Sequence, residues 1–151
     1  MLIGINPILG PEILYTLRSM GHGDTLAIVD SNFPANSLNG NVIRLDGIDI
    51  TSASKAILSV FPLDSFVKFP ALRMEIDDQP KKINDVHKDF IKCIKNFSGK
   101  NWKIGAISRK KFYDEAKKAF AIVQTSESRP FGCFILTKGV ILTDGSVWIK
   151  W

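Results

Sequence analysis

The sequence predicts an α/β fold, with a single domain whose mixed, mostly parallel sheet is flanked by helices. Short apolar runs alternate along the chain with segments of helical periodicity, which is the element order of α/β proteins. The run at residues 25–29 is almost wholly apolar, as is typical of strands buried in a parallel sheet. The 151 residues match the usual size of one domain, and no repeat, low-complexity segment or linker divides them.

Helical spacing of apolar residues predicts the helices. Pro11 suits a first turn, and Gly21 suits the left-handed position just after a helix end. Ser108 is expected to cap the last helix. The predicted helices span residues 11–20, a segment that Thr51 or Ser52 caps and Pro62 ends, residues 83–97, and residues 110–119.

Apolar runs bounded by turn residues predict the strands, at residues 25–29, 41–45, 71–76, 102–107, 120–125 and 132–137. Residues 139–142 are a candidate extension of the sheet. In the tail, residues 143–151, alternation would place Val147, Ile149 and Trp151 on one face of a strand. That strand would be either an edge strand or a contact with another subunit.

Composition limits the function classes. The net charge of +5 and the pI of about 9.3 could suggest nucleic acid, but many lysines lie on the predicted helix 83–97 and the segment before it, among aspartates. A solvated helix face explains them better, so we expect no nucleic-acid partner. The longest apolar runs are far too short to span a bilayer. The first residues lack the features of a secretory signal, so cytoplasmic residence is the default expectation.

The two cysteines and the two histidines belong to few recognisable motifs. Cys93 and Cys133 belong to no paired-cysteine or cysteine–histidine cluster, and we expect both to be reduced thiols, at least one in the core. We expect no metal site, since one histidine and scattered carboxylates are weak evidence for a zinc site. His87 lies beside the apolar stripe of its helix, which predicts a surface position.

Three other residues are candidates for chemistry. Asp30 follows the strand 25–29, and ligands of α/β sheets gather at the carboxyl ends of parallel strands. It could equally form a turn with the Ser and Asn that follow. His22 stands between glycines that would let a ligand approach closely, and it could transfer protons or simply sit near a helix end. Arg109 could hold an oxygen-rich ligand, but an exposed base explains it as well.

Several separated segments resemble one family in order and spacing. They are MGHGDTLAIVDSNFPANS, PEILYTLRSMGHGD, VIRLDG, FPLDSF and SRKKFYDEAKKAFAIVQTSE. These resemble the fucose mutarotase and ribose pyranase family (RbsD/FucU), and its fucose branch more than its ribose branch. The resemblance runs from the first residues to about Val140 and leaves the tail 143–151 outside.

The resemblance implies an isomerase that interconverts sugar anomers without cofactor or metal. His22 matches the family's proton-donating histidine, and Asp30 matches a substrate-binding aspartate that could also orient proton transfer. Arg109 matches a sugar-binding arginine. The resemblance also implies a monosaccharide substrate and a homo-oligomer, a decamer or smaller, with sites near subunit boundaries.

The chain departs from the family pattern near its end. Phe131, Gly132 and Cys133 stand where the family usually has Tyr-Gly-Asn, and the resemblance assigns sugar binding to all three positions. Phe131 could still stack on a sugar, whereas a thiol is a poor substitute for an amide. The leading expectation is an L-fucose mutarotase. The alternatives are a mutarotase acting on ribose as a pyranase does, and a sugar-binding protein without catalysis.

Overall fold

Six strands form one sheet in the order β2-β5-β1-β6-β3-β4 in the computed structural model, which describes residues 1–151. Strand β6 runs antiparallel to its neighbours β1 and β3, and the other paired strands are parallel. The mixed, mostly parallel sheet is therefore confirmed. The strands are β1 (Thr25–Val29), β2 (Val42–Leu45), β3 (Ala71–Met74), β4 (Ile104–Ile107), β5 (Ala121–Thr125) and β6 (Phe134–Thr137).

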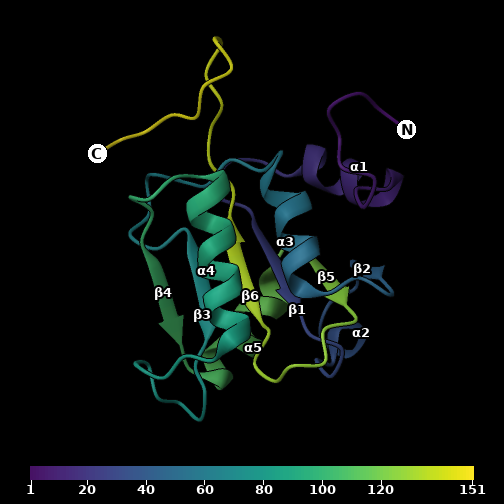
Figure 1. The fold of residues 1–151 in the computed structure, drawn as a ribbon, viewed down its shortest axis with the longest axis vertical. Helices are drawn as coiled ribbons and strands as arrows, with labels where there is room; N and C mark the ends of the chain where they lie inside the picture. Colours follow the sequence, from purple (N-terminus) through teal and green to yellow (C-terminus); the bar gives the residue numbers. More distant parts are fainter.

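Helices cover both faces of this sheet (Figure 1). They are α1 (Pro11–Ser19), α2 (Ala35–Leu38), α3 (Ile50–Leu58), α4 (Asp85–Phe97) and α5 (Arg109–Lys118). Helices α1, α3 and α4 supply one apolar cluster, and α2 and α5 supply the other. Alternate residues of β1 enter the two clusters, which explains why this strand is apolar on both faces. None of these helices is long and apolar enough to cross a bilayer.

Three local details differ from the prediction. Helix α3 is capped by Asp49, whose carboxylate accepts a hydrogen bond from the backbone N–H of Ser52 at 2.7 Å, so neither Thr51 nor Ser52 is the cap. Gly21 is not left-handed; the positive φ of 86° falls on Gly23. The short helix α2 was not predicted, because four residues carry too little periodicity to detect.

Two predictions about surface and edge are wrong. His87 is fully buried, since its ring packs against Phe134 in the core beneath α4. Residues 139–142 do not extend the sheet, and of the two alternatives given for the tail the edge strand does not form. Ile141 pairs instead with Val147 through an isolated bridge, in a hairpin outside the sheet.

The beginnings and ends of the strands lie along two opposite edges of the sheet, which are distinct from its edge strands β2 and β4. Strands β1 to β5 all end at one edge, which we call the carboxyl edge, and all begin at the other, the amino edge. Strand β6 runs the other way, so it begins at the carboxyl edge. Asp30 follows β1 and Cys133 precedes β6, so both lie at the carboxyl edge. His22 precedes β1 and lies at the amino edge.

Candidate functional site

Asp30 and Cys133 form a hydrogen-bonded pair at the carboxyl edge. The Cys133 thiol donates to a carboxylate oxygen of Asp30 over 3.4 Å, and the backbone N–H of Asn32 donates to the other oxygen over 3.0 Å. Burial raises the pKa of Asp30, although these hydrogen bonds oppose the rise. Burial, and next the charge of Asp30, raise the pKa of Cys133 far above its usual value. The thiol therefore stays protonated and donates to the carboxylate.

A small hollow opens beside this pair. Its volume is about 180 Å³, and its lining comprises Asp30, Asn32, Phe33, Met74, Tyr113, Pro130, Phe131 and Cys133. Aromatic rings and one carboxylate thus face a common space, which is the kind of lining that binds a sugar's apolar face and its hydroxyls. The structure therefore places three of the predicted sugar-binding residues, Asp30, Phe131 and Cys133, around one hollow.

The backbone of Phe131 is held in an unusual conformation. Its φ is 64°, a left-handed value that a bulky residue rarely adopts. The imidazole Nε2 of His87 lies 3.0 Å from the carbonyl oxygen of Phe131 and donates a hydrogen bond to it. His87 was not a predicted site residue, yet it supports the strained backbone of one.

An ionic cluster anchors the loop that leads to Phe131. The guanidinium of Arg129 donates to both carboxylate oxygens of Glu127 at 3.0 and 2.9 Å, and to Asp89 on α4 at 2.7 Å. The hydrogen bonds from Arg129 lower the pKa of Glu127 and raise that of Arg129. The loop is therefore bound to α4 immediately before the hollow.

Arg109 is the first residue of α5, which follows the carboxyl end of β4. It shares an edge of the sheet with Asp30 but does not line the hollow. Its backbone N–H donates to Asp78 over 3.0 Å, while its exposed side chain makes no hydrogen bond or ion pair within the chain. The guanidinium thus has no partner within the chain and lies outside the hollow.

His22 lies at the opposite edge and has a carboxylate partner. Its Nε2 is 3.1 Å from Oδ1 of Asp64, which is buried, whereas 44% of the His22 side chain is exposed. The same Asp64 oxygen accepts the backbone N–H of Phe66 at 2.9 Å, and the Phe66 ring meets the imidazole edge-on, with centroids 5.0 Å apart. With Nε2 donating to Asp64, Nδ1 is the nitrogen that carries the lone pair.

Asp64 was missed as a site residue, although the segment FPLDSF that contains it was noticed. It precedes β3, 42 residues from His22 in sequence, and only the sheet brings the two together. A groove of about 560 Å³ opens beside His22, between α1 and the residues that follow β6. Lys138 lies in its wall and donates from Nζ to the carbonyls of Leu17, in the last turn of α1, and of Met20, just after α1, at 2.6 Å each.

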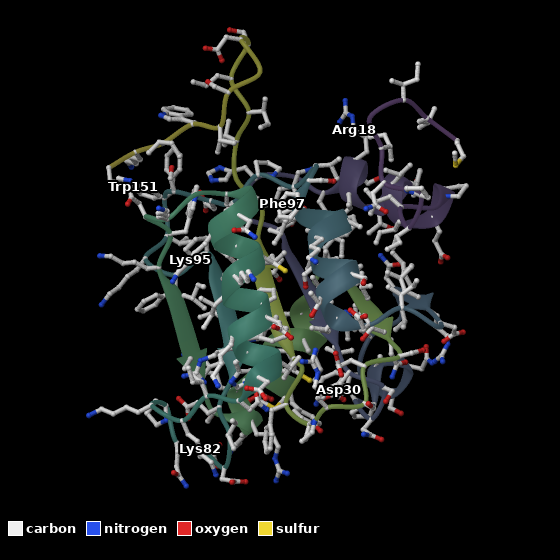
Figure 2. All side chains as sticks on the ribbon, in the orientation of Figure 1. Arg18, Asp30, Lys82, Lys95, Phe97 and Trp151 are labelled. Atoms are coloured by element: carbon white, nitrogen blue, oxygen red, sulfur yellow. The ribbon has the colours of Figure 1, made fainter.

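The two groups of candidate residues are separated by the length of β1. Figure 2 shows Asp30 at the end of the molecule opposite Arg18, which lines the groove beside His22. A five-residue strand at ~3.3 Å per residue keeps His22 and Asp30 on the order of 16 Å apart. One monosaccharide therefore cannot contact both residues of the same chain.

Comparison with known proteins identifies the family. The profile of the RbsD / FucU transport protein family matches residues 3–141. The chain belongs to the RbsD/FucU family.

Relatives within the RbsD/FucU family cover nearly the whole chain. An L-fucose mutarotase of Glaesserella parasuis is 40% identical over 146 residues, which is 95% of this chain and all of the relative. An L-fucose mutarotase of Actinobacillus pleuropneumoniae is 38% identical over 140 residues, 93% of this chain and 97% of the relative. The crystal structure of a fucose mutarotase from Streptococcus pneumoniae in complex with L-fucose superposes with a TM-score of 0.86, at 33% identity. It covers 93% of this chain and all of that one.

Proposed function

We propose that this protein is an isomerase that interconverts the α and β anomers of L-fucose. The observation that carries the proposal is the similarity, at 38–40% identity and nearly full length, to L-fucose mutarotases. The exposed imidazole of His22, held by a buried carboxylate, supports it from the side of the chemistry. An imidazole can both accept and return a proton, which is what the reaction requires.

The reaction needs only proton transfers. The anomeric hydroxyl gives up its proton, the ring oxygen gains one, and the C1–ring-oxygen bond breaks to leave an open-chain aldehyde. Rotation about the C1–C2 bond and reclosure on the other face give the second anomer. In our proposal Nδ1 of His22 exchanges these protons, while the hydrogen bond to Asp64 fixes the tautomer and stabilises the imidazolium.

Asp30 binds the sugar in this proposal. Its raised pKa brings it closer to proton exchange, and its oxygens can accept hydroxyl hydrogen bonds. Phe131 offers a ring for the apolar face of the sugar, Gly132 and Cys133 contribute the adjacent backbone, and Arg109 donates from outside the hollow. His22 and Asp30 are both catalytic candidates, so their separation within one chain must be bridged.

A second copy of the chain bridges it. We propose that His22 of one subunit meets the Asp30 hollow of another, so that each site is assembled from two chains in a homo-oligomer. The separation of about 16 Å along β1 supports this arrangement, because no rearrangement of side chains could close it. Its test mixes two inactive variants, His22→Ala and Asp30→Ala. Random co-assembly should restore about a quarter of the wild-type rate, since that share of sites pairs two intact groups. No recovery after verified mixing would refute the shared site.

The function itself is tested by saturation-transfer NMR on α- and β-L-fucose. Wild-type protein should raise the exchange rate above background, and His22→Ala should abolish the increase. Asp64→Asn should lower it, whereas Asp46→Asn, the same change at an exposed residue far from His22, should not. Absence of exchange with L-fucose would refute the proposal, and the same assay with D-ribose distinguishes a pyranase.

A second candidate function is sugar binding without catalysis. The observation that favours it is Cys133, whose thiol donates to Asp30 but cannot supply the two N–H donors of an amide. Thermal stabilisation by L-fucose together with unchanged anomer exchange would support this function and exclude the first.

A further inference from the structure

The C-terminal hairpin, residues 140–151, lies almost entirely beyond the part of the chain that the family profile matches. The backbone N–H of Trp148 donates to the carbonyl of Val140 at 2.8 Å, and Gly145 turns the chain with a φ of 85°. Figure 1 shows the hairpin, in yellow, leaving the end of β6 at the amino edge and returning toward the start of β4. The hairpin is thus an addition at the edge where His22 lies.

The hairpin is bound to the residue next to Asp64. The hydroxyl of Ser65 donates to the carbonyl of Trp148 at 2.6 Å and accepts the backbone N–H of Lys150 at 3.1 Å. Ser65 is itself buried. Asp64, the partner of His22, therefore precedes a residue whose only side-chain hydrogen bonds go to the hairpin.

The hairpin also covers the other neighbour of His22. The Phe66 ring, which meets the imidazole on one side, meets the Trp148 ring at 85°, with centroids 5.1 Å apart. Nζ of Lys150 lies 4.5 Å from the centroid of the Phe66 ring, within the range of a cation–π contact. Of the two groups that orient the imidazole, the hairpin thus contacts the Phe66 ring directly and the Asp64 carboxylate only through the neighbouring Ser65.

Apart from the hairpin, the chain holds the segment 62–66 mainly through its first three residues. The backbone N–H of Asp64 donates to the carbonyl of Thr137, and that of Gly139 donates to the carbonyl of Pro62, so the segment 62–64 is fixed to the end of β6 and the residues just after it. Beyond Asp64, the side-chain contacts of Ser65 and Phe66 run to the hairpin and to His22. Without the hairpin, Phe66 would lose the packing that limits its rotation.

We propose that the C-terminal hairpin positions the proton-transferring imidazole, with Ser65 and Trp148 as positioning residues for His22. This inference rests on the proposed function, since it assigns the hairpin a role in the same proton transfer. An imidazole held in one orientation reaches the sugar in a reactive geometry more often, so the hairpin should raise kcat more than it affects KM.

The test compares Ser65→Ala, Trp148→Ala and a chain that ends at Leu142 with wild type. We expect kcat for fucose exchange to fall about fivefold or more, as for the loss of about 1 kcal/mol of positioning contact, with KM changed less than twofold. Ser65→Thr, which keeps the hydroxyl, should restore kcat. Ser146→Ala is the matched control, because the Ser146 hydroxyl bonds only to Asp144 in the turn of the hairpin.

A second readout does not depend on activity. The chain has only two histidines, so its imidazole NMR spectrum contains the rings of His22 and His87 alone. The three disruptive variants should shift the His22 signals and leave those of buried His87 unchanged, and the unchanged His87 signals also show that each variant is folded. Wild-type kcat together with unshifted His22 signals would overturn the inference. If wild type shows no fucose exchange, the proposed function fails, while the His22 signals still decide whether the hairpin orients the ring.

Discussion

Replacing His87 should remove a large part of the protein's sensitivity to mild acid. The ring is fully buried, and burial lowers the pKa of His87 from 6.5 to about 4, with the Phe131 hydrogen bond opposing the shift and the charge of Arg73 adding to it. The folded protein therefore binds a proton at His87 less readily than the unfolded chain. The stability that the neutral His87 contributes is therefore complete above pH 6.5 and is lost as the pH falls from 6.5 toward about 4.

The size of the effect follows from the width of that window. Each pH unit between the unfolded and folded pKa values corresponds to about 1.4 kcal/mol, so the window from 6.5 to about 4 amounts to about 3 kcal/mol. That is a substantial share of the 5–15 kcal/mol by which domains are typically stable. At pH 5 about 2 kcal/mol should already be lost.

Urea unfolding at pH 7, 6, 5 and 4 measures this directly. His87→Leu has no proton to bind, so its free energy of unfolding should gain about 3 kcal/mol relative to wild type between pH 7 and pH 4. Carboxylates that titrate in the same range affect both proteins and cancel in the difference. Phe90→Leu is the control, since it replaces another fully buried ring on α4 that has no titratable group, and its difference from wild type should stay constant between pH 7 and pH 4. A pH-independent difference between wild type and His87→Leu would refute the reasoning.

Three further substitutions test other contacts. Arg129→Met leaves the buried Glu127 carboxylate without its main donor, so it should cost about 1–3 kcal/mol at pH 7. Since the pKa of Glu127 is lowered in the fold, that cost should shrink as the pH falls below 4.5 through the folded value, and a constant cost in urea titrations would contradict it. Gly139→Ala would put a Cβ 2.3 Å from the carbonyl oxygen of Leu63, and thermal unfolding should show a loss of about 1–3 kcal/mol, whereas Gly40→Ala, in open space, should show little. Phe131→Tyr adds a hydroxyl to the lining of the hollow and should lower KM for L-fucose about fivefold, as one added hydrogen bond of about 1 kcal/mol would. An unchanged KM in the NMR exchange assay would show that the ring does not face the sugar.

Most of the secondary structure could be predicted from the sequence, because strands and helices depend on local periodicity. The residues of β1 alternate between two apolar clusters, and Ser108 caps α5 by accepting a hydrogen bond from Lys111. The position of Asp30 at a strand end was likewise predictable, since it depends only on where the strand stops. The cap of α3 was misplaced by two or three residues, as several polar residues there compete for the role.

The partners of the site residues could not be predicted in the same way. Asp64 lies 42 residues from His22, and Cys133 lies 103 residues from Asp30, so each pair exists only because the sheet places their strands together. The burial of His87 could not be predicted either. Its helical position alone did not reveal that the start of β6 covers it.

The sequence by itself determined the alternating elements, the fold class and the candidate residues His22, Asp30 and Arg109. The tertiary structure decided that His22 and Asp30 face opposite edges of the sheet, and that His22 is held by Asp64 and Phe66 with the C-terminal hairpin behind them. The physical reason is range. Helix and strand formation depends on residues within a few positions of one another, whereas a site depends on which distant segments the buried sheet brings into contact.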